Sequence, residues 1–199
     1  MKNRLKNLVK NNPIDWILLR KLVLFFLVVA VITFIVNIVV RYNSVGYLQR
    51  VYSGFEPKSE FDEFLYIFRN NALTVPLVVL IVALIPIPYL WMYAIVMNGI
   101  IFGTAFAIPF TNAKVTLFEM FTELICHSII ELFAFFILFT VAFKLNKAVC
   151  QKLYKHGKNS VKKAIGNYLK LYFIYVLPLL FIAALLETYV SERFADIFR

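Results

Sequence analysis

Long apolar segments separated by short polar ones dominate this chain, and most have the length of a membrane-spanning helix. A helix of about 20 apolar residues crosses the hydrocarbon core of a bilayer. This length predicts spans at about residues 22–40, 72–85, 89–110, 124–143 and 170–190. We therefore predict an all-α integral membrane protein with about five transmembrane helices, in which residues 1–199 form a single polytopic domain.

Residues 72–110 form one apolar run that is long enough for two spans. Pro86 and Pro88 interrupt this run, and proline cannot continue a helix and favours a turn. The pattern therefore predicts a helical hairpin. Pro76 and Pro178 lie inside the second and fifth spans, where we expect a local distortion of the helix.

Two shorter pieces of the chain have one apolar face at helical spacing. They are FDEFLYIF at residues 61–68 and TLFEMFTEL at residues 116–124. This pattern is typical of an amphipathic helix. We expect both to be short helices along the outer surface, the first leading into Asn70 and Asn71 and the second into the fourth span.

Composition supports the membrane class. Hydrophobic residues make up 62% of the chain and charged residues only 16%, whereas a soluble domain carries about 25% charged residues. The net charge of +10 would suggest a nucleic-acid partner in a soluble chain. Here the positions of the charges indicate a lipid bilayer instead, and we expect no nucleic acid to bind.

The positive charges gather in two segments. The lead at residues 1–21 has six basic residues and the single acid Asp15, and residues 144–163 contain lysines and no acid. Basic segments stay on the cytoplasmic side of a membrane. With five spans, both segments fall on that side, which predicts a multi-pass protein of the cell membrane with its N-terminus inside and its C-terminus outside.

Several polar residues lie inside the apolar spans. His127 and Glu131 are four residues apart, so they lie one turn apart on one helix face. Such groups in hydrocarbon are costly and mark functional sites by default. His127 and Glu131 lie about 5 and 10 Å below the outer boundary, counted at the helical rise per residue. Glu187 has nearly the depth of His127, so we predict a polar centre in the outer half of the membrane, supported by Asn71 and Asn98.

These residue types indicate acid–base or metal chemistry. His127 can act as a general base or metal ligand, Glu131 and Glu187 as ligands or acid–base groups, and Asn71 or Asn98 can hold a carbonyl oxygen. One histidine and two carboxylates can form a three-ligand site for a divalent metal such as zinc. The single histidine and the absence of an HExxH motif leave the metal and the catalytic activity open.

Two other classes of function compete with an intramembrane hydrolase or transpeptidase. In a scaffold, export or immunity protein, the polar cluster is a hydrogen-bonded core that fixes the helix register. Gly99 and Gly103 then allow close helix contact, either within the chain or in a homo-oligomer or with other membrane proteins. A coupled permease ranks last, because such proteins place carboxylates near the midplane and usually contain an internal repeat, which this sequence lacks at any fixed period.

Four motifs in this order resemble the stage II sporulation protein M family. They are the pair Asn70–Asn71, the NGxxxG at residues 98–103, the HxxxE at residues 127–131 and the segment PLLFIAALLE ending at Glu187. The similarity covers about residues 65–190. Family patterns usually have glycine after the histidine and proline after the Glu-Leu pair, where this chain has Ser128 and Phe133.

The resemblance implies a multispanning protein that acts at the cell envelope. Family members are implicated in envelope remodelling at the sporulation septum. Relatives are encoded alongside circular bacteriocins, where roles in maturation, export or immunity are proposed. For this chain the resemblance favours the processing of a membrane-associated hydrophobic peptide by maturation, cleavage or cyclisation, with a non-enzymatic scaffold, export or immunity component as the alternative.

Overall fold

The structure is a computed structural model in which residues 14–40, 59–111, 117–154 and 161–191 are described; for residues 117–126 and 191 only the backbone is described. None of the described residues forms a strand, and five of the helices in these ranges are long and apolar enough to cross a membrane. The predicted all-α membrane fold with five transmembrane helices is therefore confirmed.

The spans follow one another along the chain, and two of them contain π-helical turns. The first, third and fourth spans are α2 (Trp16–Val40), α6 (Met92–Thr111) and α7 (Leu117–Tyr154). The second span consists of α4 (Glu60–Arg69), the π-helical turn η1 (Asn70–Thr74) and α5 (Val75–Leu84). The fifth consists of α8 (Val161–Leu171), η2 (Tyr172–Val176), α9 (Leu177–Leu186) and η3 (Glu187–Ser191).

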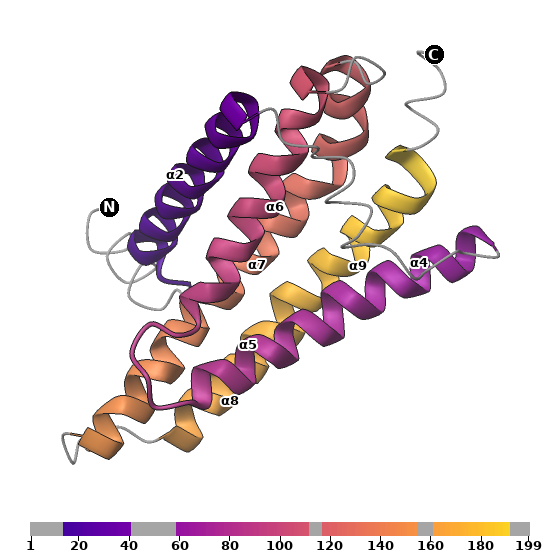
Figure 1. The fold of residues 1–199 in the computed structure, drawn as a ribbon. Coiled ribbons are helices and arrows are strands. Elements are labelled where there is room, and N and C mark those ends of the chain that lie inside the picture. The colour runs from indigo at the N-terminus through magenta and orange to yellow at the C-terminus, as the bar shows by residue number, and fades with distance from the viewer. Residues whose placement is uncertain (1–13, 41–58, 112–116, 155–160, 192–199) are drawn as a thin grey trace, which may run out of the picture.

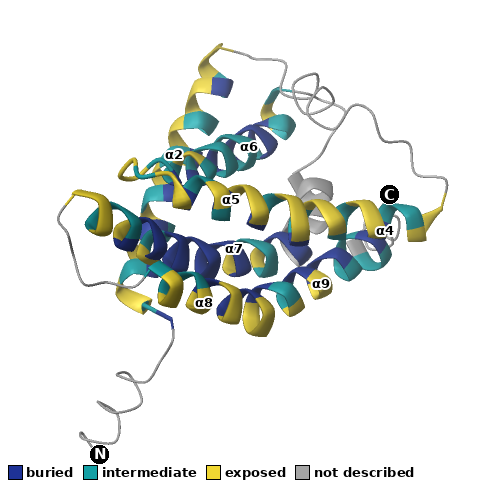
Figure 2. Cartoon of the chain, turned by 90° about the horizontal axis from the view of Figure 1, so that it is seen from below, coloured by how far each residue is buried: buried dark blue, intermediate teal, exposed yellow. Residues whose placement is uncertain are grey.

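Helix α7 is the centre of the bundle. It contacts elements of all four other spans. In its most apolar stretch of 18 residues 61% of the residues are buried inside the protein, whereas in the corresponding stretch of α2 only 17% are buried. Figure 2 shows the buried surface of α7 between α5 and the pair α8–α9, with exposed residues on the outward faces of the outer helices. Those outward faces carry large apolar side chains, which suit contact with lipid; examples are Leu24, Val31, Leu77, Ile81 and Phe173.

Helices α2 and α6 lie side by side (Figure 1) and approach closely at two glycines. A Cβ atom added at Gly103 would lie 2.3 Å from the carbonyl oxygen of Ala30, and one at Gly99 would lie 2.9 Å from a side-chain atom of α2. Beside this contact the amide of Asn37 on α2 donates to the hydroxyl of Thr104 on α6, at 3.4 Å. The glycine pair therefore serves a contact within the chain.

The second and fifth spans have the same interrupted construction. In each, an amphipathic helix is followed by a π-helical turn of 5 residues and then by a helix of 10 apolar residues with proline at its second position, Pro76 or Pro178. The predicted distortions at these prolines are therefore present as π-helical turns. The two spans run antiparallel, since Phe64 packs against Phe181 while residue 72 is bonded to residue 172.

Two tyrosines bind the backbone of the second span at its proline. Pro76 has no N–H and so cannot donate to the carbonyl of Ala72, four residues earlier. This carbonyl instead accepts a hydrogen bond from the hydroxyl of Tyr172. The hydroxyl of Tyr168 donates to the carbonyl of Pro76 at 2.7 Å. Both tyrosines are buried, so the interruption of one span is held by side chains of the other.

A turn interrupts the apolar run at Pro86 and Pro88, where the hairpin is predicted, because α5 ends at Leu84 and α6 begins at Met92. The turn leaves carbonyl groups without helical partners. The buried side-chain amide of Asn146 on α7 donates to three of them, with distances of 3.2, 2.9 and 3.3 Å to the oxygens of Ala83, Ile85 and Ile87. Helix α7 thus holds the hairpin in place.

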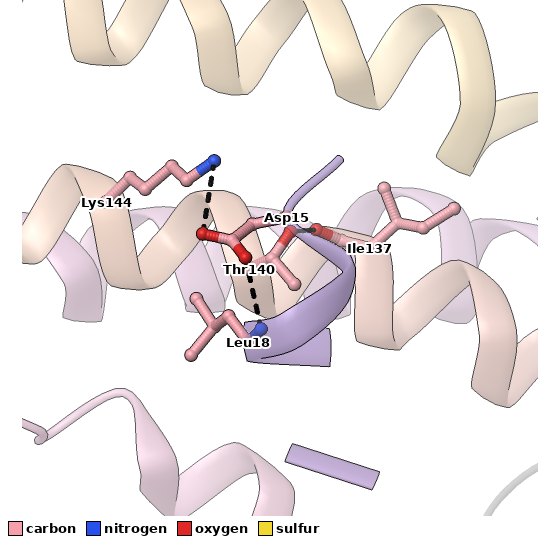
Figure 3. A network of polar contacts seen from close by, with 5 residues as sticks. All are labelled: Asp15, Leu18, Ile137, Thr140 and Lys144. Atoms are coloured by element: carbon pink, nitrogen blue, oxygen red, sulfur yellow. Dashed lines mark hydrogen bonds and ion pairs between the residues drawn. The ribbon is translucent and has the colours of Figure 1, made fainter. Parts of the chain in front are cut away.

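Polar contacts also join the beginning of α2 to α7 (Figure 3). The carboxylate of Asp15 accepts from the backbone N–H of Leu18 at 3.1 Å, as an N-terminal helix cap does. The same carboxylate forms an ion pair of 3.9 Å with Lys144, which follows the apolar run of α7. Asp15 and Lys144 therefore mark one end of the bundle.

The two amphipathic pieces are parts of longer helices. Residues 61–68 lie in α4, which Ser59 caps by accepting from the N–H of Asp62 at 3.2 Å. The helix then runs on through η1 into α5, so the second span begins 12 residues before the expected position at residue 72. Residues 117–124 of the second piece belong to α7, whereas residue 116 and the side chains of these residues lie outside the described part.

Candidate metal and acid–base site

His127, Glu131 and Glu187 converge at one end of the bundle. One ligand atom from each can be chosen so that all three lie within 4.8 Å of one another. The Nε2 atom of His127 is 3.9 Å from a carboxylate oxygen of Glu187. The structure thus brings together the three residues that the sequence singled out for catalysis or metal binding.

The local backbone explains this convergence. His127 and Glu131 lie one turn apart on α7, so they face the same neighbour. Glu187 begins the π-helical turn η3, directly after α9, and its backbone N–H bonds to the carbonyls of Ala183 and Ala184. Single π-helical turns inside α-helices are frequent at functional sites. Here the turn holds Glu187 against α7, because η3 contacts that helix.

The centre is largely enclosed by protein. His127 is only 8% exposed, Glu131 is half-buried, and the side chain of Glu187 is 33% exposed. Of the three side chains, that of Glu187 is therefore the most exposed and that of His127 is buried.

A third carboxylate lies near this centre. The carboxyl groups of Glu131 and Glu187 lie close enough to interact, and that of Glu63 lies close enough to interact with Glu187. Helix α4 carries Glu63 there because the ring of Phe64 packs against Phe181, with 5.6 Å between ring centroids. Glu63 thus adds a third carboxyl group beside those of Glu131 and Glu187.

Glu63 and Thr188 were not identified from the sequence. Glu63 lies within the amphipathic piece at residues 61–68, and the apolar face of that piece is the sequence signal that could have indicated packing against another span. Thr188 follows Glu187 and is 3% exposed. Its hydroxyl oxygen has no hydrogen-bond partner among the described residues. A buried hydroxyl without a partner carries a desolvation cost.

No described contact joins Asn71 or Asn98 to the three residues of the centre. Asn71 accepts a hydrogen bond from Asn70 at 3.1 Å in an exposed position, and the amide of Asn98 donates to the carbonyl of Ala94 on its own helix at 2.8 Å. Because the second span begins at residue 60, Phe64 rather than Asn71 lies at the level of Glu187. Their roles in binding a substrate stay predictions.

The donor set fits a divalent cation with nitrogen and oxygen ligands. An imidazole and two carboxylates are ligands that zinc accepts, and three protein ligands leave its fourth position open. The same three groups can also transfer protons without a metal. Both kinds of chemistry need the convergence that the structure shows.

A central helix surrounded by four others, with lipid-suited outer faces and a polar centre at one end, defines a multi-pass α-helical membrane protein. The chain belongs to the stage II sporulation protein M family, whose family model matches residues 22–192, which is most of the chain. No curated protein and no solved structure matches the chain. The resemblance noted in the sequence is thereby confirmed, and so is the multi-pass membrane localisation.

Proposed function

We propose that this protein processes a membrane-associated hydrophobic peptide at the centre formed by His127, Glu131 and Glu187, and that these three residues hold a divalent cation such as zinc. The observation that carries the proposal is the convergence of their ligand atoms within 4.8 Å. A histidine nitrogen and two carboxylate oxygens are ligand types that zinc binds.

The surroundings of the centre favour an apolar peptide as the substrate. Aromatic rings line the contact between α4 and the end of the fifth span, where Phe64 packs against Phe181 at 5.6 Å and Tyr189 at 6.4 Å between ring centroids. Phe68 packs against the same ring of Phe181 at 5.5 Å. Apolar side chains of a peptide can bind beside such rings while a backbone carbonyl reaches the polar groups.

A bound zinc ion supplies Lewis-acid polarisation of a carbonyl and lowers the pKa of a bound water. The chain's own groups then divide the remaining tasks. Glu63 offers a carboxylate beside Glu187 that can accept a proton from the attacking water or amine and return it to the leaving amine. Attack by water gives cleavage, and attack by a peptide amine gives cyclisation.

The proposal is tested on the purified full chain in neutral detergent. Metal content by mass spectrometry should show about one zinc per chain, as a single three-ligand site requires. His127→Ala, Glu131→Gln and Glu187→Gln should each lose most of this metal. Turnover of a hydrophobic peptide substrate should fall about 10²- to 10⁴-fold in each, the range for loss of one catalytic group, and a chelator should abolish turnover of the unmodified protein.

The matched control is Glu60→Gln, an exposed carboxylate on the first turn of α4, which should keep both metal and turnover. Melting temperatures of all variants separate a loss of chemistry from a loss of folding. If Glu131→Gln and Glu187→Gln keep their function in cells and bind no less metal than the unmodified chain, the catalytic proposal is wrong. The three residues then form the hydrogen-bonded core of a scaffold, export or immunity protein.

A further inference from the structure

A cavity of about 330 Å³ lies at the opposite end of α7 from the His–Glu centre. It is formed between the hairpin that follows α5 and the last turns of α7. The residues that line it are Pro88, Tyr89, Phe143, Asn146, Lys147, Cys150, Gln151 and Tyr154. The His–Glu centre contributes no residue to this lining, so the cavity is a separate site.

The lining changes from apolar to basic along α7. Phe143 is the last residue of the apolar run, and Lys147 and Gln151 follow one and two turns later. None of the described residues that line the cavity is acidic. The residues Tyr89 and Tyr154 are 62% and 63% exposed, and exposed tyrosines gather where a membrane meets water. The cavity therefore lies at the level of lipid headgroups.

The wall of the cavity is held in place before any ligand arrives. Asn146 binds the carbonyls of the hairpin, and the hydroxyl of Tyr154 donates to the carbonyl of Pro86 at 2.8 Å. Tyr89 has a backbone φ of 66°, in the left-handed region that residues other than glycine rarely adopt. Strained residues of this kind persist where the surrounding structure fixes them, and they cluster at binding sites.

We propose that this cavity binds the phosphate headgroup of an anionic membrane lipid, with Lys147 as the partner of the phosphate charge. Basic pockets between transmembrane helices bind such headgroups on the cytoplasmic side. A free phosphate needs only the charge, whereas a lipid also uses the apolar boundary at Phe143 and the aromatic rings. The position of the cavity at the end of an apolar span thus favours a lipid over a soluble phosphate compound.

The test uses the purified full chain in neutral detergent, with its melting temperature followed during addition of a short-chain phosphatidylglycerol. The melting temperature should rise and saturate, and a phosphatidylcholine with the same acyl chains should have little effect. Lys147→Gln should bind phosphatidylglycerol about fivefold more weakly, the effect of one lysine near an anionic headgroup. Lys152→Gln is the matched control, since Lys152 is exposed on α7 and does not line the cavity. It should bind like the unmodified chain.

A second variant, Cys150→Phe, fills the cavity without changing its charge and should abolish saturable binding, provided that its melting temperature without lipid is unchanged. Equal weakening by Lys147→Gln and Lys152→Gln would mean that a diffuse basic surface attracts the lipid, which overturns the proposal. An equal response to both lipids also overturns it. Saturable stabilisation by inorganic phosphate alone, lost in Lys147→Gln, would identify a phosphate site in place of a lipid site.

Discussion

At the scale of single residues, side-chain hydroxyls and amides replace backbone hydrogen bonds that proline removes. The carbonyl of Ala72 loses its helical donor at Pro76 and receives the hydroxyl of Tyr172. Asn146 performs the same task for the turn that contains Pro86 and Pro88. Within a membrane such bonds matter because no water is present to satisfy a free carbonyl.

Tyr172→Phe should therefore lower the free energy of unfolding. The change keeps the ring and removes only the hydroxyl, which leaves a buried acceptor unsatisfied at a cost of about 1–3 kcal/mol. Tyr175→Phe is the control, because Tyr175 is exposed on the same π-helical turn, and its effect should stay within about 0.5 kcal/mol. Unfolding by denaturant in mixed micelles measures both. Equal effects of the two changes would contradict the assigned role of the Tyr172 hydroxyl.

At the scale of helices, close packing is decided by where small residues meet a neighbouring backbone. Gly103 meets the carbonyl of Ala30 on α2, whereas Gly166 on α8 has no atom within 4 Å of the position that a Cβ would take. Both glycines lie inside helices. They differ only in their surroundings, so the same substitution at each separates packing from helix propensity.

Gly103→Ala should destabilise the protein by about 1–3 kcal/mol, because α2 must move away to make room for the added methyl group. Gly166→Ala should stabilise it by about 0.5–1 kcal/mol, because alanine costs less entropy than glycine in a helix. Unfolding curves of the two variants under identical conditions show whether each substitution lowers or raises the free energy of unfolding. If Gly103→Ala leaves the free energy of unfolding unchanged, α2 and α6 do not pack as closely at Gly103 as described.

At the scale of the whole molecule, the two proposed sites lie at opposite ends of α7. His127 and Lys147 are 20 residues apart on this helix, a distance of about 30 Å and thus about the thickness of the hydrocarbon core. The described parts of the basic segments, residues 14–21 and 144–154, lie at the end with Lys147. The charge pattern therefore predicts that the His–Glu centre faces the outside and that the cavity faces the cytoplasm.

Reporter fusions test this orientation directly. A reporter after Arg199 should be detected outside the cytoplasm, and one inserted near Lys158 should be detected inside, because an odd number of spans separates the basic lead from the C-terminus. Both reporters on the same side would mean that the number of membrane crossings is wrong, and the hairpin at Pro86 and Pro88 would be the first place to re-examine.

The sequence by itself determined the features that depend on local patterns. The length of apolar runs predicts the spans, the proline pair predicts the hairpin, and the spacing of His127 and Glu131 places both on one helix face. These predictions succeed because helix length, helix period and the missing N–H of proline act within a few residues. They hold wherever the helices are placed relative to one another.

Only the tertiary structure decided which faces meet. A helix such as α5, which is apolar on all sides, has no sequence signal for the direction of its neighbour. The approach of Glu63 to Glu187, the position of Asn71 away from the centre and the bond of Tyr172 to Ala72 follow from the antiparallel packing of two interrupted spans. The two spans share the order of an amphipathic helix, a π-helical turn and an apolar helix with proline at its second position, although the side chains around these features differ.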